Sequence, residues 1–166
     1  MGASTITCSS GGSGYTQRMR VALALLPVEA NTLRAPLLAW MLKADDPAEV
    51  LLVCEVLRPH NEELRERLWA LAEEAGTPAA VRLRALTALA AYDPENARWG
   101  KAGGTAAELL LTADPFYRGQ WATALRPVRA ALRGRLAEVC RGEKLAEHRQ
   151  TAALVLAEYA GGDRRR

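Results

Sequence analysis

The chain has 166 residues, enough for one domain with a substantial hydrophobic core. Ala and Leu dominate its apolar residues, with 32 and 25 copies against nine Val and one Ile, and this composition favours helices over sheets. The net charge of +3 indicates only mild basicity, and no apolar stretch is long enough to span a membrane. We therefore expect an all-α protein without a membrane span.

Cysteine usage and the N-terminal residues favour the cytoplasm. Cys8, Cys54 and Cys140 are too few and too scattered for a disulfide framework. The first residues have no cationic start followed by an apolar run, so we expect no signal peptide. Residues 1–15 are rich in Ser, Gly and Thr, and we expect them to form a flexible leader.

Helix signals follow in chain order. A first helix is predicted over 16–26, where Pro27 ends it, and a second over 32–43. Asp46-Pro47 opens a third over 47–57, because the carboxylate can cap free N–H groups and proline suits the first turn. Further helices are predicted at 61–75 with Asn61 as cap, 78–91 with Thr77 as cap, 104–112, 115–125, 128–141 and 144–160.

The predicted connections are short, except for one. A loop over 93–103 is the longest interruption, and residues 161–166 form a charged tail. Connections as short as the others make neighbouring helices antiparallel.

Internal repeats indicate how the helices are arranged. Arg18 and Arg20 match Arg82 and Arg84 at an offset of 64 residues. Leu57-Arg58-Pro59 matches Leu125-Arg126-Pro127 at an offset of 68. The repeating unit is therefore about 66 residues, or two helical hairpins of about 33, and such a hairpin cannot bury its apolar face alone. The sequence predicts an α-solenoid of about four stacked antiparallel hairpins, with 16–26 as an unpaired N-terminal helix.

The stretch Pro78-x-x-Val81-Arg82-x-x-Ala85-x-x-Ala88-Leu89 resembles the second helix of a HEAT repeat. The turns at 45–47 and 114–115 resemble the turn that precedes it. The resemblance covers about 16–160 and implies that 47–57, 78–91, 115–125 and 144–160 are second helices that line a concave side. Two positions depart from the pattern: Leu51 stands where Arg is usual, and Tyr117-Arg118 replaces Val-Arg.

A longer set of matches resembles the HEAT-like region of large planctomycete-type proteins. There this region accompanies a serine/threonine kinase domain or a formylglycine-generating-enzyme-like domain. The matching pieces are Ala90-Ala91-Tyr92-Asp93-Pro94, Arg98-Trp99, Ala113-Asp114-Pro115, Ala124-Leu125-Arg126-Pro127-Val128 and Ala157-Glu158-Tyr159. The resemblance implies that the chain is an accessory part of a larger multidomain bacterial protein and holds none of its neighbours' catalytic residues.

Residues that could carry chemistry are sparse. His60 and His148 belong to no Cys/His spacing that suits zinc, and Ser occurs only in the leader. The glycine-rich stretch over 100–104 lacks the residue order of a phosphate-binding loop. We expect no catalytic residue, no cofactor and no metal.

The preferred interpretation is a non-catalytic scaffold or protein–protein interaction module, whose partner is another protein or a flanking domain of the same chain. Its contact face is predicted to use the second-helix residues Arg82, Arg84, Arg118 and Gln120. Trp99 falls in the long loop and is the best single candidate for a partner contact. By contrast, Trp40, Trp69 and Trp121 fall within predicted helices and suit packing.

Two alternatives stay open. One is nucleic-acid binding, in which an Arg-rich stripe faces phosphates; acidic residues interleave with this stripe, which comprises Arg58, Arg65, Arg67, Arg126, Arg129, Arg133 and Arg135. The other is an enzyme on a helical-repeat scaffold, such as a HEAT-like DNA glycosylase, which would need an acidic residue and aromatic residues in one concave pocket.

Overall fold

The computed structural model describes residues 30–142 and 146–161, and within these ranges every regular element is a helix. The all-α prediction is therefore confirmed. The α-helices are α2 (Ala30–Met41), α3 (Pro47–Leu57), α4 (Asn61–Glu73), α5 (Ala79–Tyr92), α6 (Trp99–Thr112), α7 (Arg118–Ala124), α8 (Arg129–Gly142) and α9 (Ala146–Gly161). Two 3-10 helices, η1 (Arg58–His60) and η2 (Arg126–Val128), lead into α4 and α8. The predicted leader 1–15, the helix 16–26 and residues 162–166 of the predicted tail lie outside the described residues.

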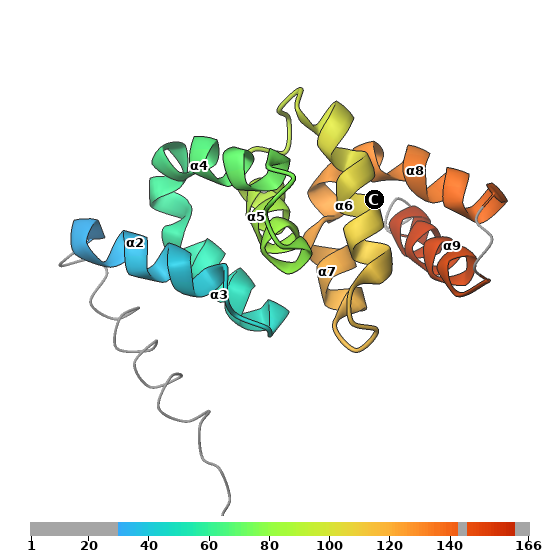
Figure 1. Cartoon of the computed structure of the whole chain (residues 1–166), viewed down its shortest axis with the longest axis horizontal. Helices are drawn as coiled ribbons and strands as arrows, with labels where there is room; N and C mark the ends of the chain where they lie inside the picture. Colours follow the sequence, from blue (N-terminus) through green and yellow to red (C-terminus); the bar gives the residue numbers. More distant parts are fainter. Residues whose placement is uncertain (1–29, 143–145, 162–166) are drawn as a thin grey trace, which may run out of the picture.

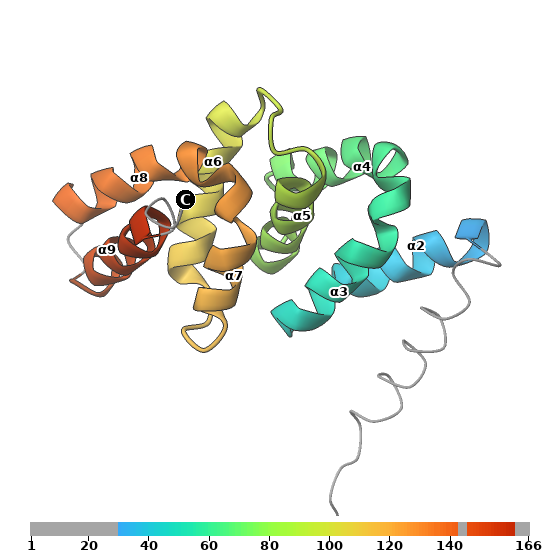
Figure 2. The ribbon, with the colours of Figure 1, turned by 180° about the vertical axis from the view of Figure 1, so that it is seen from behind.

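Three pairs of consecutive helices pack together, α2 with α3, α4 with α5 and α8 with α9, whereas α6 packs mainly on α8. Figures 1 and 2 show α2 with α3 at one end and α8 with α9 at the other. The second helices also contact one another, since α5 packs on both α3 and α7. First helices of the later pairs do the same, because α6 packs on α8.

The sequences Asp46-Pro47 and Asp114-Pro115 precede α3 and α7, but the two helices begin differently. Asp46 accepts a hydrogen bond from the Ala48 N–H at 2.8 Å, with Pro47 in the first turn, so α3 begins where predicted. Asp114 accepts the equivalent bond from the Phe116 N–H at 2.8 Å, but residues 115–117 form a turn and α7 begins only at Arg118. The prediction that this helix begins at 115 is wrong, because the Tyr117 N–H bonds to the Asp114 carbonyl and closes a tight turn first.

Two predicted helix caps are also wrong. Asn61 lies inside the helix rather than capping it, because η1 leads directly into α4. Thr77 donates its hydroxyl to the Glu74 carboxylate instead of capping α5. The extended backbone of Pro78 then directs the chain into the helix at Ala79.

Helix α5 is the centre of the core. Eight consecutive residues, 83–90, are buried, because α3, α4, α6 and α7 surround this helix. Small side chains such as Ala85 and Ala88 allow these neighbours to approach closely. The expectation that 78–91 lines an open concave side is therefore not met along most of this helix.

The glycine-rich stretch 100–104 lies inside helix α6, so the predicted loop over 93–103 ends at Arg98. A Cβ atom on Gly103 would come within 2.5 Å of the Ala131 backbone oxygen on α8. Gly103 therefore sets how closely α6 and α8 can pack, whereas the neighbouring Gly104 has open space around it. Close packing of α6 on α8 explains the glycine at 103, and a phosphate-binding role is not needed to explain it.

We predict opposite effects for two neighbouring glycine substitutions. Gly103→Ala should lower the free energy of unfolding by about 1–3 kcal/mol, because the clash is with backbone and pushes α6 from α8. Gly104→Ala should raise it by roughly 0.5–1 kcal/mol, since alanine is the better helix former. Urea unfolding followed by circular dichroism measures both. Equal effects for the two variants would contradict the packing role of Gly103.

The Leu-Arg-Pro repeats end two second helices in a 3-10 turn. Pro59 has no N–H for the Glu55 carbonyl, and the Arg58 N–H bonds to that carbonyl instead. The Cys54 carbonyl thereby loses its usual helical partner, and the buried Tyr92 hydroxyl donates to it at 2.7 Å. The second copy is built alike, because the Tyr159 hydroxyl donates to the Ala122 carbonyl at 3.0 Å. Each tyrosine thus ties one second helix to the end of the second helix before it.

We predict that each tyrosine hydroxyl is needed for stability. Tyr92→Phe and Tyr159→Phe should each lower the free energy of unfolding by about 1–3 kcal/mol, because each leaves a buried carbonyl without a donor. The double variant should lose roughly the sum of both. Tyr117→Phe, at a half-buried position, is the control and should change it by less than about 0.5 kcal/mol. A double variant as stable as wild type would refute the proposed role of these bonds.

Candidate functional site

The residues that were predicted to share a contact face differ in how exposed they are. Gln120 on α7 is exposed, and Arg82 is half-buried, where its Nε donates to the Ala72 carbonyl at 3.1 Å. Arg84 is only 8% exposed. These arginines bind the protein's own backbone, so they contribute less open surface than the sequence indicated.

Arg84 connects α5 to the turn that follows α2. Its guanidinium donates to the Leu42 carbonyl at 3.1 Å and to the Asp45 carboxylate at 3.0 Å. Burial lowers the pKa of Arg84, and the nearby Asp45 charge opposes this effect. Because Asp45 is itself well exposed, the ion pair is open to solvent on one side.

Arg118 plays a comparable part at the turn that follows α6. It donates to the Ala113 carbonyl at 2.8 Å and to the Thr151 hydroxyl at 3.2 Å. Thr151 lies 67 residues after Arg84, close to the offset of the sequence matches, and its hydroxyl accepts a hydrogen bond from Arg118. In the described part of the chain, the Nε atoms of Arg84 and Arg118 are the buried side-chain polar atoms that lack a hydrogen-bond partner.

Trp99 is not a loop residue, and this part of the prediction is wrong. It begins α6, is 4% exposed, and packs edge-on against Trp69 with ring centroids 5.4 Å apart. Its indole N–H donates to the Asp93 carbonyl at 2.9 Å, while the Trp69 N–H donates to the Asp93 carboxylate at 3.1 Å. Trp99 therefore holds the loop between α5 and α6 against the core and presents little surface to a partner.

The hydrogen bonds that Asp93 accepts also affect its pKa. Burial raises the pKa of this carboxyl, but hydrogen bonds from Trp69 and Asn96 and the charge of Arg65 outweigh that effect. The pKa of Asp93 therefore lies below its usual value, and the residue is charged at neutral pH.

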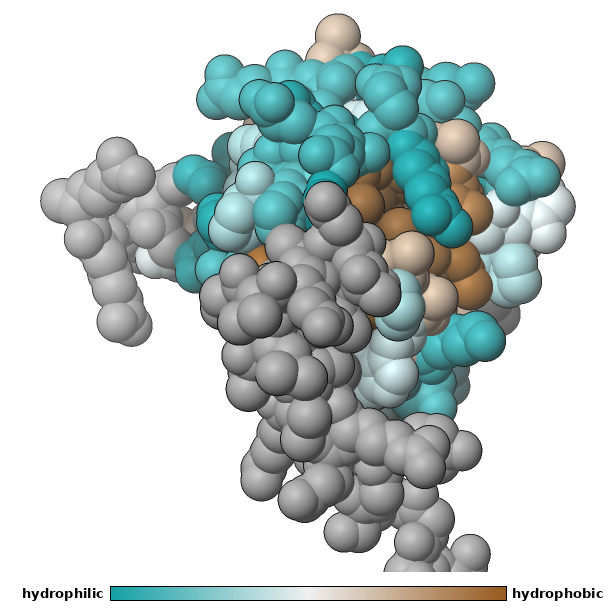
Figure 3. Space-filling view, turned by 90° about the vertical axis from the view of Figure 1, so that its left-hand side faces the viewer, coloured by the Kyte–Doolittle hydropathy of each residue, from teal (hydrophilic) through white to brown (hydrophobic). Residues whose placement is uncertain are grey.

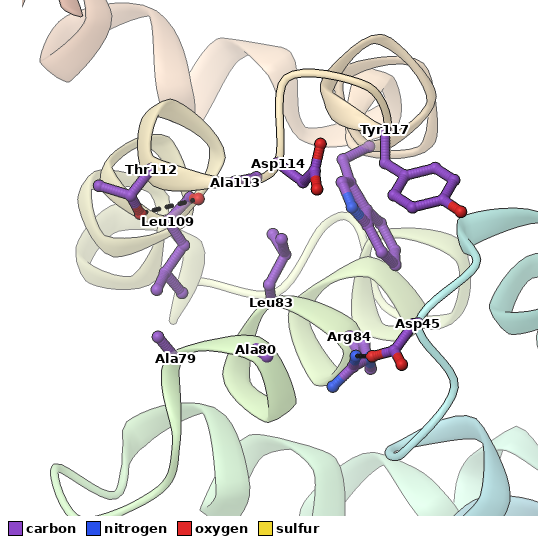
Figure 4. Close-up of a pocket in the computed structure, with 11 residues that line it drawn as sticks. Asp45, Ala79, Ala80, Leu83, Arg84, Leu109, Thr112, Ala113, Asp114 and Tyr117 are labelled. Atoms are coloured by element: carbon purple, nitrogen blue, oxygen red, sulfur yellow. Dashed lines mark hydrogen bonds and ion pairs between the residues drawn. The ribbon is translucent and has the colours of Figure 1, made fainter.

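A pocket of about 380 Å³ lies on one side of the turn formed by residues 113–117 (Figure 4). The apolar part of its wall comes from α5 and α6, and includes Ala79, Leu83 and Leu109. Tyr117 and Trp121 of the α7 segment add aromatic rings. The carboxylates of Asp45 and Asp114 and the guanidinium of Arg84 complete the lining, so the pocket combines apolar and charged walls.

A groove lies on the other side of the same turn, between the α7 segment and α9. It consists of two adjoining hollows of about 650 and 220 Å³, which share Pro115, Arg118 and Thr151. Leu154, 66% exposed, lines the groove. Phe116, 80% exposed, lies on the turn and packs edge-on against Tyr117, which lines the pocket. We call this area the turn surface: the 380 Å³ pocket, the α7–α9 groove and Phe116 between them.

The charges around the groove are mostly negative. Among the lining residues, Asp114, Glu147 and Glu158 contribute three carboxylates against the guanidinium of Arg118, and Arg126 bonds to the Glu158 carbonyl nearby. Such a surface favours a ligand that brings apolar side chains together with a positive charge. Sequence reasoning missed Phe116 and Leu154, because single apolar residues in helical patterns do not reveal which of them the neighbouring helices leave uncovered.

The arginines of the predicted basic stripe are interleaved with acids in space as well as in sequence. Arg58 pairs with Glu55, Arg65 lies 3.7 Å from Asp93, and Arg135 pairs with Glu108 and Glu138. Arg126 donates to the Glu158 carbonyl. A phosphate backbone would have to compete with these carboxylates for the same guanidinium groups.

The groups that could carry catalysis stand apart from one another. Within the described ranges, no three His, Cys, Asp or Glu side chains lie where they could hold a metal ion together. His148 lines the groove, whereas His60 lies at the end of η1. Burial raises the pKa of the Cys54 thiol to about 12, so this thiol stays protonated at neutral pH. None of the helices in the described ranges has the length and apolar character that a membrane crossing requires.

Comparisons with known proteins do not assign the chain to a family. No family model matches it, and no curated protein or solved structure matches it either.

Proposed function

We propose that the chain is a non-catalytic helical-repeat module that binds a protein partner at the turn surface. The observation that carries the proposal is the position of Phe116 and Leu154. These two side chains are the most exposed large apolar residues in the described part of the chain. Leu154 lines the α7–α9 groove, and Phe116 follows Pro115, which lines both hollows of that groove. Large apolar side chains that stay exposed beside a hollow are typical of protein interaction sites.

The same proposal includes the architecture and setting that the sequence indicated. The succession of helix pairs and the equivalent tyrosine bonds support an α-solenoid, in which each pair covers the apolar side of the next. The HEAT-like resemblance supports an accessory role in a larger cytoplasmic protein of bacterial type. A flanking domain of the same chain or a separate protein would then supply the binding segment.

The partner is expected to be a peptide segment with apolar side chains next to a basic residue. The apolar side chains would contact Phe116 and Leu154, and the basic residue would face the carboxylates of Asp114, Glu147 and Glu158. Nucleic acid is the less favoured partner, because its phosphates would meet these carboxylates at the most exposed apolar area.

The test is selection of peptides from a random display library on the immobilised full chain, followed by titration of the selected peptides. Phe116→Ala and Leu154→Ala should each weaken binding about tenfold or more, as expected for anchor residues. Leu52→Ala is the matched control, since Leu52 is 50% exposed on α3 and lines neither the pocket nor the groove, and it should leave the affinity unchanged.

Two outcomes would contradict the proposal. One is a set of selected peptides that bind the Phe116→Ala and Leu154→Ala variants as tightly as they bind the wild-type protein. The other is tight binding of duplex or single-stranded DNA that falls steeply between two salt concentrations, which would favour the nucleic-acid alternative.

A further inference from the structure

The 380 Å³ pocket holds a hydrogen-bond donor that the protein's own contacts leave unused. Trp69, Trp99 and Trp121 are the buried tryptophans of the described ranges, and the indole N–H groups of the first two donate to Asp93. Trp121 is 5% exposed and lines the pocket, but its indole N–H has no hydrogen-bond partner within the described residues. This N–H is not fully enclosed by protein, so an acceptor on a ligand can reach it.

Further unpaired donors lie at the start of α5. Ala79 and Ala80 are the first two residues of this helix, and both line the pocket. N–H groups in the first turn of a helix have no partner inside the helix, and no side chain caps α5. The pocket therefore favours a ligand that brings acceptor oxygens, together with apolar groups that can contact Leu83 and Leu109.

The side-chain charges of the pocket leave one net negative charge. Asp45 and Asp114 contribute two carboxylates, and Arg84 contributes one guanidinium. Arg84 pairs with Asp45 at 3.0 Å, whereas Asp114 has no ion-pair partner in the described part of the chain. Figure 4 shows Asp114 on the turn above α5, apart from the Arg84–Asp45 pair. A positive charge on a ligand is therefore favoured at Asp114 rather than at Asp45.

The arginine residue of a peptide meets these requirements together. Tyr117 and Trp121 supply aromatic rings on which a guanidinium can stack, and the fork of its N–H groups suits the Asp114 carboxylate. The peptide carbonyl groups beside the side chain supply acceptors for the indole and α5 N–H groups. A simple ammonium ion would satisfy the carboxylate but not the donors.

Hydrophobic area alone does not single out a binding site in this molecule. Figure 3 shows such an area at the end that carries α2, where hydrophilic residues surround it. The pocket differs because aromatic rings, an unpaired charge and unpaired donors meet its apolar wall. It also adjoins the groove, since Thr112, Ala113 and Asp114 line both.

We propose that the pocket binds an arginine side chain of the peptide partner, with the guanidinium at Asp114 and the neighbouring peptide carbonyl groups at the indole N–H of Trp121 and the start of α5. This inference rests on the proposed peptide binding and narrows it. Of the three carboxylates that a basic residue could face, Asp114 binds it, from the pocket side. The apolar side chains of the same peptide occupy the α7–α9 groove.

Nuclear magnetic resonance of the isotope-labelled full chain tests the pocket, with N-acetyl-arginine amide as the probe. The indole N–H signal of Trp121, identified by its absence in Trp121→Phe, should shift as this probe is added. N-acetyl-citrulline amide has nearly the same shape without the charge, and it should bind about tenfold more weakly. This comparison uses the wild-type protein and does not depend on the folding of a variant.

Two matched charge removals locate the guanidinium. Asp114→Asn should weaken binding of the arginine probe about tenfold, while the amide oxygen can still accept the Phe116 N–H bond of the turn. Glu147→Gln removes the same charge from the groove and should leave the affinity for the probe unchanged, because Glu147 does not line the pocket. Leu154→Ala should weaken peptide binding but not probe binding.

Three outcomes would overturn this inference: no shift of the Trp121 signal, equal binding of the citrulline probe, or equal weakening by Asp114→Asn and Glu147→Gln. Tighter binding of free L-arginine than of the amide probe would also overturn it, because the ligand would then be a free amino acid. Selected peptides that depend on Leu154 but contain no basic residue would contradict this inference and leave the proposed function intact. A bound probe without any selected peptide would contradict the proposed function, and the pocket would then belong to a small guanidinium compound.

Discussion

A hydrogen bond from a buried tyrosine to a freed helical carbonyl organises this protein. Pro59 ends α3 in a 3-10 turn, and the Cys54 carbonyl that this turn releases takes its donor from Tyr92, on the next second helix. Since an unpaired buried carbonyl is costly, the turn and the tyrosine stabilise the fold only together. The bond from Tyr159 to the Ala122 carbonyl repeats the arrangement, so it fixes the spacing between second helices twice.

The turn surface lies at one of two turns whose surrounding sequences match, the turn after α2 and the turn after α6, and the two turns differ in their contacts. After α2, Arg84 reaches from the next second helix and bonds to the turn. At the turn after α6, the residue that corresponds to Arg84 is Thr151. Here Arg118, at the start of α7, donates to the Ala113 carbonyl of the turn and to the Thr151 hydroxyl. Thr151 lines the α7–α9 groove, and the Asp114 turn delays the start of α7 and places Phe116 outside the helix. A change in one arginine position therefore accompanies the surface that we propose for binding.

Much of the helical architecture could be predicted from the sequence, but the site could not. Asp46-Pro47 marks a helix start locally, and the Leu-Arg-Pro matches predict two equivalent units. Trp99 was misplaced because glycines at 100, 103 and 104 resemble a loop, although Gly103 is required by the close approach of α8. The buried position of Arg84 and the exposure of Phe116 depend on contacts between distant helices, which periodicity does not encode. The recurrence of tyrosine at 92 and 159 was the one signal in the sequence that could have indicated the central bond.

An alkaline titration of the tyrosines tests that bond most directly. Burial raises the pKa of the Tyr92 and Tyr159 phenols above their ordinary value of about 10. Their contribution to stability is therefore complete below pH 10 and is lost as the pH rises further. In a comparison of wild type with the Tyr92→Phe/Tyr159→Phe protein, the two phenols should ionise only as the helical circular dichroism signal disappears. Ionisation of both near pH 10, with that signal unchanged, would contradict the account.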